Sequence, residues 1–218
     1  MTGAGWFATG QGHDTPQAER TSAAIAGTTT LCYGSAMISP SPPLIFGAAV
    51  VMGVAGCGKT TIAEALAARL GARCIEGDRL HSPQNIAKMS AGVPLTDEDR
   101  WPWLSRIGGT LIGSDGAVAA CSALRKVYRE TITRAAGRPV AFVFLKGERA
   151  LIESRMHLRT GHFMPTSLLD SQFATLEEPG ADELSITLDL AQTPAVLVEQ
   201  AIRFLTEVAA AVPATEPE

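Results

Sequence analysis

Eight consecutive residues, Gly53 to Thr60, carry the clearest chemistry in this chain. They read GVAGCGKT, a full match to the phosphate-binding pattern GxxxxGK[ST]. In such a loop the backbone amides converge on nucleotide phosphates, the Lys59 amine reaches the β and γ phosphates, and the Thr60 hydroxyl can ligate Mg²⁺. The nucleotide-binding residues expected here are Gly53, Gly56, Cys57, Gly58, Lys59, Thr60 and Thr61.

The neighbouring sequence has the order that the loop requires. Residues 44–52 form a short apolar run without charge, which is typical of a parallel strand buried on both faces. After the loop, Ile62, Leu66 and Leu70 recur at four-residue spacing and Gly71 stands where a helix usually stops. Strand, glycine-rich loop and helix therefore follow one another.

The rest of the chain alternates short apolar runs with helical segments. Carboxyl ends of parallel strands are where ligands bind, so residues just after each run are of interest. The pattern predicts an α/β fold with a five-stranded parallel sheet and helices on both faces. Strands are expected at 72–76, 116–121, 139–145 and 184–188, and helices at 82–91, 100–112, after Ser122 and at 195–211.

Composition bounds the class of protein. The chain has 218 residues, is 46% hydrophobic and carries a net charge of −4 with no dense Lys/Arg cluster, so nucleic acid is not an expected partner. No apolar stretch approaches the roughly 18 residues of a membrane span. Its four cysteines form no CxxC pair and its four histidines show no metal-ligand spacing. A cytoplasmic protein fits this pattern.

Residues 1–43 differ from the remainder. They are rich in Gly, Ser, Thr, Ala and Pro, lack periodicity and close with SPSPP, which indicates a disordered extension. Met37 is a candidate translation start. We expect one kinase-like domain at 44–212 and a short tail at 213–218.

A basic segment lies between the fourth and fifth expected strands. Arg155, Arg159 and His162 occur within ESRMHLRTGHFMP at residues 153–165. A phosphoryl-transfer enzyme needs positive charge over the transferring group and a lid that excludes water. We therefore expect a mobile lid at about 155–176, with Arg155 and Arg159 near the phosphates. A solvated charged helix face is the alternative.

Four further strings, taken with the loop, make the chain resemble the gluconate kinases, which are small P-loop metabolite kinases. They are GDRLHSPQNIAKMSAGVPLTDEDRWPWL from Gly77, CSALRKVYR from Cys121, LKGE from Leu145 and GHFMPTSLLDSQFATLEEPGAD from Gly161. The last of them is similar to the family's lid and the helix after it. Two positions depart from the family pattern: Arg125 stands where Lys is usual, and Cys57 where Ser is common.

The resemblance implies transfer of the γ-phosphoryl group of ATP to the 6-hydroxyl of D-gluconate, with Mg²⁺ and in a homodimer. Gluconate is a polyol with a carboxylate, so its site needs hydroxyl acceptors, for which Asp78 is suited, and cations. The cations expected for the carboxylate are Arg100, Arg125, Arg129 and His81. Asp78 is expected to orient the attacking hydroxyl and accept its proton, or to act as an indirect Mg²⁺ ligand. Lys59 and Arg155 complete the catalytic set. The expected substrate residues are Asp78, His81, Arg100, Arg125, Arg129 and His162.

Several alternatives stay open at this point. His81 could instead bond to a local backbone group, whereas Trp101 and Trp103 are expected to pack rather than stack on substrate. The adenine is expected near residues 192–194. A GTPase would need an NKxD string, but Asn85 is the only asparagine. Another small-metabolite kinase, for shikimate, a nucleoside monophosphate or a related sugar acid, and a catalytically silent nucleotide-binding protein remain as rival functions.

Overall fold

The computed structural model describes residues 47–113, 116–157 and 166–211, all of which belong to one structural unit. The extension expected at 1–43 and the tail expected at 213–218 lie outside the described residues. Within the described part, no helix has the length and apolar character that a membrane crossing requires.

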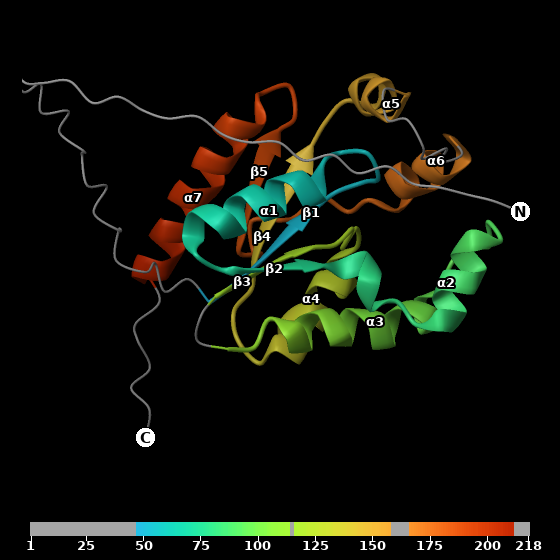
Figure 1. Ribbon diagram of the computed structural model, residues 1–218, viewed down its shortest axis with the longest axis horizontal. Helices are drawn as coiled ribbons and strands as arrows, with labels where there is room; N and C mark the ends of the chain where they lie inside the picture. Colours follow the sequence, from blue (N-terminus) through green and yellow to red (C-terminus); the bar gives the residue numbers. More distant parts are fainter. Residues whose placement is uncertain (1–46, 114–115, 158–165, 212–218) are drawn as a thin grey trace, which may run out of the picture. The chain divides into compact units, whose positions relative to one another are not determined.

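A five-stranded parallel sheet forms the centre of the fold, as predicted (Figure 1). The strand order is β2-β3-β1-β4-β5, and every neighbouring pair is parallel. The strands are β1 (Ala48–Met52), β2 (Arg73–Glu76), β3 (Ala117–Ala120), β4 (Ala141–Lys146) and β5 (Ser185–Asp189). The expected start of the fourth strand at Pro139 is wrong by two residues, since a proline cannot donate to the ladder.

Helices cover both faces of the sheet, because β1 is apolar on both sides. Ala49 and Val51 pack with α1 (Lys59–Leu70) and α7 (Pro194–Ala211), whereas Ala48, Val50 and Met52 pack with α3 (Asp97–Thr110) and α4 (Lys126–Ala136). Figure 1 shows these two helix pairs on opposite sides of the strands. The central strand is therefore shielded from water on both faces.

Capping residues set where two helices begin. Ser82 accepts a hydrogen bond from the Asn85 amide and precedes α2 (Pro83–Ser90). Thr96 and Asp99 form a reciprocal capping box at the start of α3, so that helix begins at Asp97, three residues before the predicted start. The polar run DEDR, residues 97–100, forms the first turn of α3.

Helix α6 (Thr166–Thr175) lies within the region expected to be a lid, at about 155–176, and helix α5 (Arg149–His157) ends at its start, whereas residues 158–165 of that region lie outside the described residues. Helix α5 overlaps the charged segment at 153–165, for which a helix face was only the alternative, because its sequence is highly charged and has no clear apolar period. Helix α6 matches the helix that the family resemblance implies. A short 3₁₀ helix, η1 (Gly77–Leu80), follows β2 and completes the elements around the site.

Candidate active site

The phosphate loop joins β1 to α1 and is shaped by three glycines. Gly53, Gly56 and Gly58 have φ values of 141°, 79° and 89°, which residues with side chains rarely adopt. Gly58 is the N-cap of α1 and no side chain caps the helix. The backbone N–H groups of the first turn of α1 are thus free to bind an anion such as a nucleotide phosphate. Lys59 Nζ donates a hydrogen bond to the Val54 carbonyl at 3.0 Å.

Gly56 is needed for a second reason. A Cβ atom at this position would overlap Met156 Cγ and lie 2.8 Å from its sulfur, because α5 lies over the loop. The side chain of Ile152 on the same helix is also close, at 3.3 Å from that Cβ position. Helix α5 therefore forms a cover over the loop at Gly56, a contact that the sequence did not indicate.

The side chains of Thr60 and of Glu76, at the end of β2, place two oxygen atoms close together. Thr60 Oγ1 donates to Glu76 Oε2 at 2.7 Å. Glu76 was not among the predicted site residues, but its position as the last residue of β2 was a usable signal, since ligands bind at strand ends. Asp78 follows within η1. Gly77 lets this turn approach β3, because a Cβ there would overlap the Ala120 carbonyl.

The surroundings of His81 disfavour its cationic form. Its ring stacks on Trp103 with centroids 4.1 Å apart, and its Nδ1 lies 3.4 Å from Asn85 Nδ2. Burial lowers the pKa of His81 below its usual range, against the opposing effect of Asp78. The expectation of a cationic His81 is therefore corrected: at neutral pH the ring can only donate or accept a hydrogen bond. Trp103 is a packing residue as predicted, and its indole nitrogen donates to the Gly77 carbonyl at 2.8 Å.

Arg125 and Arg100 share one carboxylate. Arg125 Nη1 lies 2.6 Å from Asp97 Oδ2, and Arg100 Nη1 lies 3.6 Å from Asp97 Oδ1. Tyr128 donates its phenolic proton to Asp97 Oδ1 at 2.5 Å, and both guanidinium groups lie over its ring. These contacts lower the pKa of Asp97, the hydrogen bond from Tyr128 most. We call Asp97, Arg100, Arg125 and Tyr128 the arginine cluster; neither Asp97 nor Tyr128 was predicted.

Arg129 has a structural role, which corrects its expected contact with substrate. Its side chain is 1% exposed, and Nε and Nη2 donate to the two carboxylate oxygens of Glu183 at 2.5 and 2.8 Å. Nη1 donates to the carbonyls of Ala123, Leu124 and Glu177. A guanidinium so engaged holds the segment before β5 against α4, and it has no open face toward the site.

A cavity of about 280 Å³ lies beside the phosphate loop. Arg155 forms part of its wall and donates to the Leu190 carbonyl at 2.7 Å. The cavity also includes Gln192 and Pro194, the region where the adenine was expected. Its lining residues are Gly56, Cys57, Gly58, Thr61, Ile62, Arg155, Leu190, Gln192, Pro194 and Leu197.

The remaining predicted positions divide into two groups. Arg159 and His162 lie outside the described residues, so the structure does not place them. Cys57 is buried, and burial raises the pKa of its thiol. A buried, protonated thiol is a poor nucleophile, in keeping with the expected structural role.

The fold and the site together define a class, the small-molecule P-loop kinases. The solved structure of an APS kinase from Mycobacterium tuberculosis, bound to AMPPNP and APS, shares the fold at a TM-score of 0.53 and 19% identity, covering 75% of this chain and 99% of that one. No family model matches the chain.

Comparisons at higher identity define the family. The chain is 49% identical over 158 residues to a gluconokinase of Gluconobacter oxydans, covering 71% of this chain and 88% of the relative. It is 45% identical to the thermosensitive gluconokinase of Escherichia coli, with coverages of 69% and 83%. A crystal structure of a gluconokinase from Sinorhizobium meliloti matches at a TM-score of 0.71 and 48% identity, covering 76% of this chain and 95% of that one. This chain belongs to the gluconokinase family.

Proposed function

We infer that this protein transfers the γ-phosphoryl group of ATP to the 6-hydroxyl of D-gluconate, giving 6-phosphogluconate and ADP. The observation that carries the inference is the position of the phosphate loop beside η1, with Asp78, and beside the arginine cluster. The loop follows β1, η1 follows β2, and Arg125 follows β3. Because these three strands are neighbours and parallel, their carboxyl ends place nucleotide and acceptor groups at one edge of the sheet.

Each reacting group has a residue suited to it. The Lys59 amine would neutralise charge on the transferring phosphoryl group. The Asp78 carboxylate would orient the 6-hydroxyl and accept its proton as the new phosphate ester bond forms and the bond to the ADP oxygen breaks. Arg155, at the wall of the nucleotide cavity, would add positive charge on the phosphate side.

Acceptor recognition would fall to the arginine cluster and His81. Arg125 and Arg100 supply cations for the gluconate carboxylate, and they are already oriented by Asp97. Neutral His81 and the Asp78 carboxylate would bond to hydroxyl groups. The site thus combines cations at one end with neutral and anionic acceptors at the other, as a polyol acid requires.

The residues near Thr60 fit Mg²⁺. This ion prefers hard oxygen ligands and keeps several waters, so a hydroxyl and a carboxylate beside nucleotide phosphates are a suitable donor set. Thr60 would be the direct ligand, with Glu76 and Asp78 holding coordinated water. When bound, the ion would offset negative charge on the phosphates.

We further propose that the protein acts in the cytosol as a homodimer. The support for the dimer is the family resemblance alone. Free Cys57, Cys74 and Cys121 among the described residues suit a reducing compartment. Light scattering on the full chain tests the dimer through its mass.

Coupled ADP release with Mg²⁺ and ATP tests the function directly. D-gluconate is offered beside shikimate, glycerate, idonate and AMP at equal concentrations. Turnover selective for gluconate is the expected result. Turnover with another acceptor supports kinase activity but refutes gluconate as the substrate. ATP binding without turnover of any acceptor refutes both the kinase activity and the substrate.

A further inference from the structure

One peptide unit of the phosphate loop is held from both sides. The carbonyl of Val54 accepts the hydrogen bond from Lys59 Nζ, at 3.0 Å. The amide of the next residue, Ala55, donates to the side-chain oxygen of Gln172 at 2.6 Å. Because the C=O and N–H of a trans peptide point in opposite directions, the two side chains lie on opposite edges of this unit.

Local bonds hold only the carbonyl edge of this peptide among the described residues: besides Lys59, the Cys57 amide donates to the Val54 carbonyl at 3.4 Å. Gly53 precedes it and Gly56 follows it, both at positive φ, and glycine gives the backbone wide rotational freedom. If the Val54–Ala55 peptide turned, its carbonyl would leave Lys59. At the amide edge, the described residues supply a bond from Gln172, 117 residues away in the sequence, which restrains the rotation that the local carbonyl bonds resist from one side.

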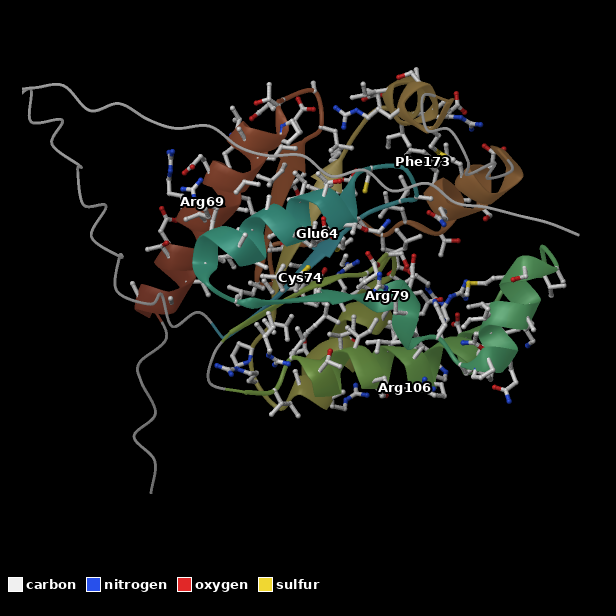
Figure 2. All side chains as sticks on the ribbon, in the orientation of Figure 1. Glu64, Arg69, Cys74, Arg79, Arg106 and Phe173 are labelled. Carbon is white, nitrogen blue, oxygen red and sulfur yellow. The ribbon has the colours of Figure 1, made fainter. Side chains whose placement is uncertain are left out.

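Helix α6 is well anchored for this task. Leu169 is 1% exposed and belongs to the hydrophobic core that also contains residues of α1 and α7. Phe173, labelled on α6 in Figure 2, packs against the same core. Beyond the helix, the Glu177 amide donates to the Leu124 carbonyl at 2.8 Å. Gln172 therefore extends from a supported helix and reaches the loop from a fixed position.

We propose that Gln172 is a positioning residue for phosphoryl transfer, which acts through Lys59. By holding the Ala55 amide, it aims the Val54 carbonyl at the Lys59 ammonium. That group has three donors, so it can keep this carbonyl bond while it bonds to phosphate oxygens. This inference rests on the proposed function, and it adds a residue that ties α6 to the catalytic lysine.

A double-mutant cycle tests whether Gln172 acts through Lys59. Single-turnover transfer from labelled ATP to gluconate is measured for wild type, Gln172→Met, Lys59→Met and the double variant. Methionine matches the length of glutamine but cannot accept the amide bond. We expect Gln172→Met to lower the transfer rate about tenfold, the scale of one hydrogen bond. We expect the double variant to be no slower than Lys59→Met alone.

The control is Ala174→Met, which places the same side chain at an exposed position of α6 and should leave the rate and the melting temperature at wild-type values. The KM for gluconate should stay unchanged in Gln172→Met, since the acceptor site is not touched. A wild-type rate in Gln172→Met, or losses that multiply in the double variant, overturns the inference. Absent gluconate turnover in the wild type overturns the proposed function instead, so the two failures are distinct.

Discussion

Replacing Glu183 by glutamine tests whether Arg129 is a structural residue. The change removes the charge that faces Arg129 but keeps the size of the side chain. It weakens the bonds from Arg129 Nε and Nη2, and also the bond that the Gly180 amide donates to Glu183 Oε1 at 3.0 Å. The guanidinium, 1% exposed, would be left with three carbonyls and no counter-charge.

The expected cost follows from that burial. Removing one partner of a buried ion pair typically destabilises a protein by about 3–5 kcal/mol, because the remaining charge stays desolvated. The side-chain amide introduced by Glu183→Gln retains one acceptor oxygen, so we expect the low end, about 3 kcal/mol. For a domain of this size that corresponds to a fall in melting temperature of roughly 6–12 °C.

Urea unfolding followed by circular dichroism measures the free energy, and thermal melts measure the midpoint. The matched control is Glu199→Gln, which breaks the 2.6 Å pair with Arg69 between α1 and α7, where both side chains are about half exposed. Figure 2 labels Arg69 at this surface. The control should lose no more than about 1 kcal/mol. Equal losses in the two variants refute the structural role of Arg129, as does a Glu183→Gln variant of full stability with a raised KM for gluconate.

The same pair predicts a pH dependence. The hydrogen bonds from Arg129 hold the pKa of Glu183 below its usual range. A carboxyl whose pKa is lowered on folding stabilises the protein above its unfolded pKa, about 4.3, and that contribution is lost as the pH falls through the folded value. The stability difference between wild type and Glu183→Gln should therefore be full at pH 7 and shrink below about pH 4. A difference that grows on acidification contradicts this assignment.

Three further predictions concern the site. Gly56→Ala should abolish most turnover, because the new Cβ meets Met156 and the positive φ is strained; an active variant with wild-type ATP affinity would refute the close cover by α5. Asp78→Asn should lower kcat by about 100-fold or more while ATP affinity, measured by calorimetry, changes little; unchanged kinetics remove Asp78 from the reaction. In native protein, iodoacetamide should label Cys74 well before Cys57, because the thiol pKa is raised at both positions but only Cys74 is exposed; peptide mass spectrometry would show the reverse order if Cys57 is accessible.

Much of the fold could be predicted from local patterns. The strands β1, β3 and β4 were expected because each is a short apolar run, whereas β2 and β5 are less apolar and were expected from their place between helical segments; the parallel sheet is confirmed. The errors in the predicted elements were at their boundaries, because capping residues decide where a helix begins. The capping box of Thr96 and Asp99 starts α3 earlier than its apolar period indicates. Helix α5 could not be predicted, since it is held by contacts such as Ile152 with the core rather than by an amphipathic pattern of its own.

The sequence by itself determined the phosphate loop, because eight adjacent residues supply its phosphate-binding groups and the loop needs only a strand before it and a helix after it. The same local reading supplied the family and the acceptor motifs. Only the tertiary structure decided which side chains are free to act. Arg129 and Glu183 are 54 residues apart, and Ala55 and Gln172 are 117 apart. Whether an arginine contacts a substrate or a buried carboxylate depends on which elements pack together. The spacing of residues within one segment does not encode that packing.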